Sequence, residues 1–167
     1  FMANGLRLNR GSLQKLRQFS KSPVDFLMPD VIRGELEQHL EEKINSAMQS
    51  LKKGIKDAND CLSCDDEKLE SAKELLLNEE EAKKLAQKKV GEFIKSTGAL
   101  LIKCGDYLSL STLLDTYFSS KPPFANKAHK KHEFPDAMVL LAIEAWAEEE
   151  DKLVLAVSLD NDWCAYG

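Results

Sequence analysis

Short apolar runs that alternate with amphipathic helical stretches constrain the fold of this chain more than any other feature. The runs are Val24–Met28, Ala99–Lys103 and Leu153–Val157. A continuous apolar run of this length is typical of a strand buried on both faces of a parallel sheet. Strands separated by helices therefore predict an α/β domain with a mostly parallel central sheet.

Two long amphipathic helices are predicted between the first two strands. One begins at Val31 and carries an apolar stripe as far as Ile55. The other begins at Asp65 or Asp66, and Gly98 is its expected stop. Their apolar stripes face a core or a partner, and the two helices are expected to form an antiparallel hairpin.

Three further helices are expected outside this hairpin. A short one follows Gly11 with Ser12 as its N-cap, and another covers Leu108–Phe118. The prolines that follow Lys121 cannot continue a helix, so residues 121–133 are expected to form a loop. Pro135 suits the first turn of the last helix.

Composition indicates a soluble globular domain, and the charge is unevenly distributed. The 167 residues are 43% hydrophobic and 31% charged, with a net charge of −5. No apolar run is long enough to cross a bilayer, so no membrane partner is expected. Residues 1–24 hold five basic residues and no acid, and residues 121–132 are also free of acids. These stretches are either solvated surfaces or a track for phosphates.

The cysteines favour a reducing compartment. Of the four cysteines, Cys61 and Cys64 alone have the spacing of a metal or redox pair, and no second pair matches them. A mixed metal site with His129 and His132 is the weaker alternative. Free thiols in the cytoplasm are the expected state.

Acidic side chains occur where the predicted strands end or the predicted helices begin. Glu35 is expected in a first helical turn, and Asp136 follows Pro135. Asp160 and Asp162 follow the apolar run Leu153–Val157. Each acid alone is explained by capping or by the helix dipole. Together at one sheet edge they would repel each other unless a cation or protons neutralised them.

Such a group of carboxylates is suited to Mg²⁺ or Mn²⁺. Glu35, Asp136 and Asp160 are the expected metal ligands, and Asp162 is a further ligand or a base that orients water. A metal held in this way lowers the pKa of bound water and stabilises charge on a phosphate, so hydrolysis of a phosphodiester is the leading function. Lys130 and Lys131, with neighbouring Lys127, are candidates for holding the phosphate backbone, and His129 and His132 are weaker ones.

The chain resembles the PIN (PilT N-terminus) nuclease domain, in a bacterial branch with a long helical insertion, here at about 37–97. The resemblance covers most of residues 1–167 as a single domain. The stretches that carry it are Leu27–Leu36, Lys121–Phe124 with Phe134–Ala137, and Val154–Trp163.

The resemblance implies a three-layer α/β/α sandwich and a metal-dependent endoribonuclease that cuts single-stranded RNA. Glu35, Asp136 and Asp160 would correspond to the family's acids, with Ser158 and Asp162 as accessory groups. A toxin or a defence effector is the expected role. The apolar stripes of the long helices leave room for a homodimer or for an inhibitory protein partner such as an antitoxin.

The sequence departs from the family pattern at both ends. PIN domains carry their first aspartate at the end of the first strand, and Phe1–Gly5 resembles the residues directly after that aspartate. The first strand with its acid, and the last strand expected after Tyr166, are therefore expected to lie outside this sequence. Little activity is expected of a polypeptide that lacks this metal ligand.

Two alternatives remain open at this point. A catalytically incomplete module would keep the fold and use its basic loops and long helices to bind RNA or protein. A structure-specific DNA flap nuclease uses similar acids, but nothing in the sequence resembles the DNA-gripping elements of those enzymes. Comparison of RNA and DNA oligonucleotides as substrates separates the two nucleases.

Overall fold

The computed structural model describes residues 1, 5–62, 66–124, 133–158, 163 and 166. The chain divides into two compact units. The first contains residues 1–24 and 34–99, and the second contains residues 25–33 and 100–167. No helix among the described residues combines the length and the apolar composition that a membrane span requires.

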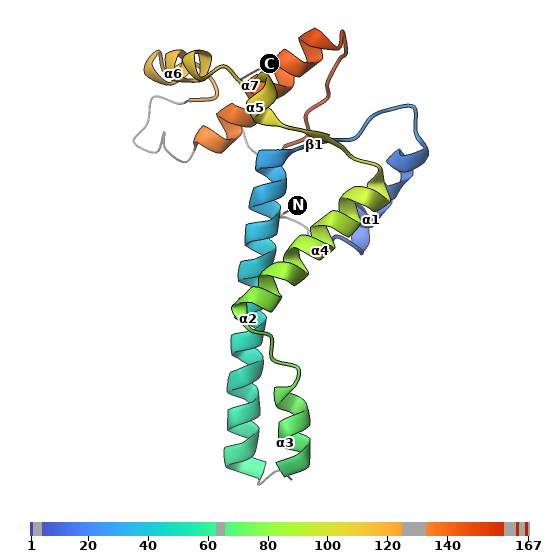
Figure 1. Cartoon of the computed structure of the whole chain (residues 1–167), viewed down its shortest axis with the longest axis vertical. Helices are drawn as coiled ribbons and strands as arrows, with labels where there is room; N and C mark the ends of the chain where they lie inside the picture. Colours follow the sequence, from blue (N-terminus) through green and yellow to red (C-terminus); the bar gives the residue numbers. More distant parts are fainter. Residues whose placement is uncertain (2–4, 63–65, 125–132, 159–162, 164–165, 167) are drawn as a thin grey trace. The chain divides into compact units, whose positions relative to one another are not determined.

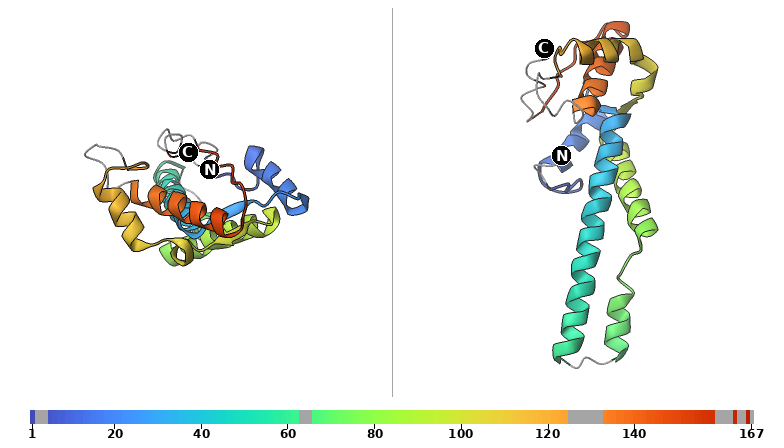
Figure 2. Two further views of the ribbon diagram at one scale, coloured as in Figure 1. Left: turned by 90° about the horizontal axis from the view of Figure 1, so that it is seen from above. Right: turned by 90° about the vertical axis from the view of Figure 1, so that its left-hand side faces the viewer.

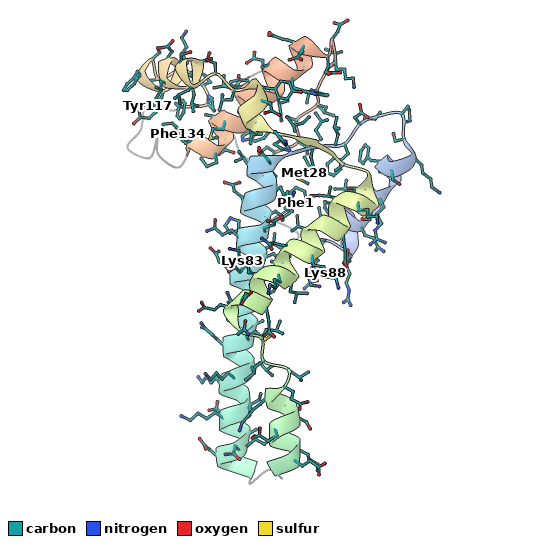
Figure 3. All side chains as sticks on the ribbon, in the orientation of Figure 1. Phe1, Met28, Lys83, Lys88, Tyr117 and Phe134 are labelled. Carbon is teal, nitrogen blue, oxygen red and sulfur yellow. The ribbon has the colours of Figure 1, made fainter. Side chains whose placement is uncertain are left out.

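The N-terminal segment of the first unit packs against the last helix of that unit, α4 (Glu79–Thr97). The segment forms α1 (Gly11–Lys15) and a 3₁₀ helix, η2 (Leu16–Lys21), and α1 has no side-chain cap, so the predicted Ser12 cap is wrong. The Phe1 ring meets the Phe93 ring edge-on, with centroids 5.7 Å apart (Figure 3). This contact holds the chain start on the buried face of α4. The buried residues of the unit are Leu6, Leu8, Leu13, Leu36, Leu40, Ala82, Ala86, Val90, Phe93 and Thr97.

The longest element is α2 (Asp30–Leu62), whose predicted apolar stripe buries Leu36 and Leu40. In the first unit, α3 (Asp66–Lys73) lies beside the C-terminal half of α2, and α4 lies beside the N-terminal part (Figures 1 and 2). These helices run alongside one another, and their assignment as an insertion into the domain stays a prediction.

The second long helix of the expected hairpin is in fact two helices, α3 and α4. The Asn78 side chain accepts a hydrogen bond of 2.9 Å from the backbone N–H of Glu81, and the Asn78 N–H donates to the Glu81 carboxylate. This reciprocal capping box starts a new helix. The predicted stop is confirmed, because Gly98 ends α4 in the left-handed region with φ of 67°.

The second unit contains a two-stranded parallel sheet made of β1 (Leu27–Pro29) and β2 (Leu100–Ile102). Met28 pairs with Leu101 in the register, and the Leu100 N–H donates to the Phe26 carbonyl at 2.8 Å. Two of the predicted strands are thus confirmed, although β1 lies later in the chain than the predicted Val24–Met28. Pro29 ends the strand, where its missing N–H is tolerated.

Among the described residues of the second unit, three helices pack together. The short α5 (Cys104–Tyr107) and the longer α6 (Leu110–Phe118) both contact α7 (Phe134–Glu149). The predicted helices at Leu108–Phe118 and after Pro135 are confirmed within a few residues, and α5 was not expected. The core forms two clusters, one around Cys104, Val139 and Ala142 and the other around Leu113, Phe124 and Ala137.

The predicted strand at Leu153–Val157 is wrong. Residues 152–158 form irregular chain, and the side chains of Leu153, Leu155 and Val157 are exposed. A strand needs a neighbouring strand for its backbone hydrogen bonds, and within the described part of the chain no strand pairs with Leu153–Val157. The sheet of the described residues therefore has two strands, and the three-layer sandwich stays a prediction.

Candidate active site

Asp136 lies in the first turn of α7, where the sequence predicts it. Pro135 stands in the same turn, and its fixed φ and missing N–H suit a helix start. The free backbone N–H groups of a helix start favour a negative charge nearby. Asp136 is half-buried, so its carboxylate is neither fully solvated nor withdrawn from solvent.

Trp163 holds the Asp136 carboxylate from the C-terminal part of the chain. The indole Nε1–H donates a hydrogen bond of 2.9 Å to Asp136 Oδ1. The indole also packs against the cluster of Cys104, Val139 and Ala142. A side chain fixed by packing and by a hydrogen bond orients its acceptor, so Trp163 sets the direction of the Asp136 carboxylate. The sequence analysis missed this role of Trp163.

An aromatic cluster fixes the start of α7 on its other side. The Tyr117 and Phe134 ring centroids lie 4.9 Å apart, and Figure 3 shows these two side chains close together. Phe124 is 2% exposed and lies 5.3 Å from Tyr117 and 5.1 Å from Phe134. This cluster packs Phe134 against α6 and Phe124, and so holds the helix turn that carries Asp136.

Asp30 lies directly after β1. Cys104 follows β2, and Lys103 is the one residue between the end of that strand and Cys104. Asp30 Oδ1 accepts a hydrogen bond of 3.0 Å from the Cys104 N–H, which is the first N–H of α5. Burial raises the Asp30 pKa, but hydrogen bonds from Cys104 and from nearby backbone N–H groups lower it below its ordinary value. The carboxyl ends of the two strands are thus tied together by the charged side chain of Asp30.

Glu35 and Ser158, two other predicted site residues, are exposed. Glu35 is the sixth residue of α2 and therefore lies in its second turn, so the predicted first turn is wrong because the helix already starts at Asp30. Glu35 belongs to the first unit, and Asp136 and Ser158 belong to the second. Their convergence stays a prediction.

The remaining predicted site residues lie outside the described residues. These are Asp160, Asp162, Lys127, Lys130 and Lys131, together with His129 and His132. Among the residues that are described, no group of three or more His, Cys, Asp or Glu side chains is placed to hold a metal ion. The predicted metal centre is therefore untested.

Comparison with known families identifies the family of this chain. A family model described as PIN domain matches residues 1–163. The chain belongs to the PIN domain family. No curated protein and no solved structure matches it. PIN domains have an α/β fold, are generally nucleases that use Mg²⁺ or Mn²⁺, and act on nucleic acids.

A second contact in this PIN domain ties its C-terminal segment to α7. The Tyr166 hydroxyl donates a hydrogen bond to the Glu144 carboxylate. Burial raises the Tyr166 pKa above its ordinary value, and the hydrogen bond to Glu144 and the charges of Glu144 and Glu148 raise it further. Trp163 and Tyr166 therefore contact α7 at two places.

Proposed function

We propose that this PIN domain is a metal-dependent endoribonuclease that hydrolyses phosphodiester bonds of single-stranded RNA. The hydrogen bond from Trp163 to Asp136 carries this proposal. Asp162 directly precedes Trp163 in the chain, and Asp160 lies three positions before it. The bond therefore supports a site in which these acids join Asp136. We assign it the role of a toxin or defence effector. A location in the cytoplasm is consistent with the free thiols of both described cysteines.

The donor set fits Mg²⁺ or Mn²⁺. Glu35, Asp136 and Asp160 would hold the metal, because hard divalent cations prefer carboxylate oxygens. Such an ion acidifies bound water and stabilises negative charge on a phosphate. Trp163 would keep Asp136 oriented through the hydrogen bond to Oδ1. Asp162 would ligate the metal or orient the attacking water.

The substrate would be held by its backbone. Lys127, Lys130 and Lys131 belong to the acid-free stretch before Asp136, and they would bind phosphates as point charges. Ser158 is exposed and precedes Asp160 by two residues, and it would contribute to phosphate binding. Contacts of this kind carry no base specificity, which suits cleavage of varied single strands.

Cleavage by the purified full-length protein tests the proposal. We expect cutting of single-stranded RNA with Mn²⁺ or Mg²⁺, little cutting of DNA, and loss of cutting in Asp136→Asn. Asp115→Asn is the matched control, because Asp115 is an exposed acid of α6. The proposal fails if diverse RNAs remain intact with either metal, or if Asp136→Asn cuts as fast as the control.

A binding module that has lost catalysis is the second candidate. In that case the fold binds RNA or protein and the carboxylates hold no ion. Calorimetric titration with Mn²⁺ separates the candidates, because heat that disappears in Asp160→Asn would exclude the binding module.

A further inference from the structure

An apolar groove with a basic rim lies between α2 and α3 in the first unit. Its volume is about 600 Å³, within the range of ligand sites in proteins. Ile55, Leu69 and Leu76 line it and are only half-buried. Figures 1 and 2 show α3 running beside the C-terminal half of α2, which places the groove along these two helices. Every described residue of its lining comes from α2, from α3 or from the segment that follows α3.

The rim of the groove is positively charged. Lys52, Lys53 and Lys56 line it from α2, and no ion pair to another described residue engages them. Lys73 lines it from α3 and pairs with Glu70 at 2.7 Å. None of the described lining residues is acidic. The lining residues therefore combine an apolar floor with four lysines, one of which is paired with Glu70, while the described acids of these two helices do not line the groove.

The shape of the groove suits a third helix. The lining residues of α2 run from Gln49 to Asn59, which at 1.5 Å per residue is about 15 Å, or nearly three helical turns. In a helical bundle, a third helix packs against two helices whose apolar faces are half-exposed and buries those faces. An amphipathic helix lays its apolar face into such a groove with side chains spaced three or four residues apart.

Charge complementarity selects an acidic partner. We propose that the α2–α3 groove is a docking site for an acidic amphipathic helix of a partner protein. Leucine-like side chains of that helix cover Ile55, Leu69 and Leu76, and its flanking carboxylates meet Lys52, Lys53 and Lys56. A second copy docked through the same groove would bring identical lysine rims together, and like charges oppose that arrangement. The phosphate backbone of RNA would make no favourable contact with the apolar side chains of the groove floor.

Binding of synthetic peptides tests this proposal independently of nuclease activity. Three labelled helical peptides, each about 20 residues long so that a stable helix can form, are compared by fluorescence anisotropy at near-physiological salt. The first has leucines on one face and glutamates beside them, the second has lysines in place of the glutamates, and the third has serines in place of the leucines. We expect the first peptide to bind at least tenfold more tightly than either of the others.

Charge reversal of the rim lysines tests whether the acidic peptide binds at this groove. The triple variant Lys52→Glu, Lys53→Glu and Lys56→Glu should bind the acidic peptide at least tenfold more weakly than the parent protein does. A control variant with the same change in net charge, Lys83→Glu, Lys88→Glu and Lys95→Glu on α4, should bind as the parent protein does. All six lysines are exposed, so both proteins are expected to fold, which circular dichroism verifies.

Several results would overturn the proposal. These are binding of none of the peptides, equal binding of the acidic and basic peptides, or an equal effect of the two triple variants. An RNA oligonucleotide that binds the parent protein and not the rim variant would show a nucleic-acid groove instead. Sedimentation that shows a dimer of the parent protein and a monomer of the rim variant would show contact between copies.

Discussion

Asp30 and Cys104 are separated by 74 positions in the chain and joined by a hydrogen bond of 3.0 Å between the Cys104 N–H and Asp30 Oδ1. The bond links residues that lie just beyond the ends of two paired parallel strands. It also satisfies the first N–H of α5, a group that has no partner within its own helix. Asp30 therefore closes the carboxyl end of the sheet and starts the next helix at the same time.

Removal of the Asp30 carboxylate should destabilise the protein. We expect Asp30→Ala to lower the free energy of unfolding by about 1 kcal/mol, the usual cost of losing a side-chain cap. Denaturant unfolding measures this loss of free energy. Asp25→Ala is the control, because Asp25 makes an exposed ion pair with Lys152 and such pairs contribute little. Equal losses in the two variants would contradict the role given to Asp30.

Stability should fall in acid partly through the same carboxylate. The folded-state pKa of Asp30 is below its ordinary value of 3.8. Its contribution is therefore complete above that value and is lost as the pH falls through the folded pKa. Asp30→Asn keeps an acceptor but cannot titrate, so its unfolding free energy should decrease less below about pH 4. Parallel curves for Asp30→Asn and the parent protein would exclude this contribution.

Cys104 should react slowly with thiol reagents. Burial, together with the hydrogen bond and charge of Asp30, raises the pKa of its thiol to about 11, so little thiolate exists at neutral pH. Variants that retain Cys104 or Cys61 as their single cysteine can be compared with a disulfide reagent at neutral pH. The exposed Cys61 should react at least tenfold faster. Similar rates would show that Cys104 is accessible.

Replacement by alanine should have opposite effects on stability at Gly98, which caps α4, and at Gly91, which lies inside α4. Gly98 has a positive φ, and an added Cβ would lie 3.0 Å from the Ser20 Cα, so Gly98→Ala should destabilise by about 1 kcal/mol or more. Gly91 lies inside α4 with open space around it, so Gly91→Ala should stabilise by about 0.5–1 kcal/mol. Thermal unfolding of both variants checks the opposite signs.

Local signals in the sequence predicted local features well. Gly98 as a helix stop and Pro135 as a helix start depend on backbone conformation alone, and both are confirmed. The break before α4 was missed although its signal was present, since Asn78 stands three residues before Glu81 in a capping-box pattern. The apolar stripe that continues on both sides of this break concealed it.

Features that depend on distant partners could not be read from local patterns. The apolar run Leu153–Val157 has strand character, but a strand forms only where a neighbour pairs with it. The contacts of Asp30 with Cys104 and of Asp136 with Trp163 each join segments far apart in the chain. Of the predicted acids, Asp136 is found at its predicted helix start, and the meeting of the acids stays a prediction.

Trp163 should tune the candidate active site without contacting substrate. Trp163→Phe keeps most of the packing against Cys104 and Val139 but removes the hydrogen bond to Asp136. Loss of such a supporting hydrogen bond typically costs about 10–100-fold in metal affinity or activity. We therefore expect weaker Mn²⁺ binding by calorimetry and slower RNA cleavage.

Trp146→Phe is the control for this substitution. Trp146 lies in α7 and is 4% exposed, but no hydrogen bond joins it to Asp136 among the described contacts. Its replacement should lower the unfolding temperature and leave Mn²⁺ affinity within about twofold, because a packing defect alone does not reorient the carboxylate. If both variants lose metal affinity equally, or if Trp163→Phe retains it, Trp163 does not position Asp136, and its hydrogen bond serves stability alone.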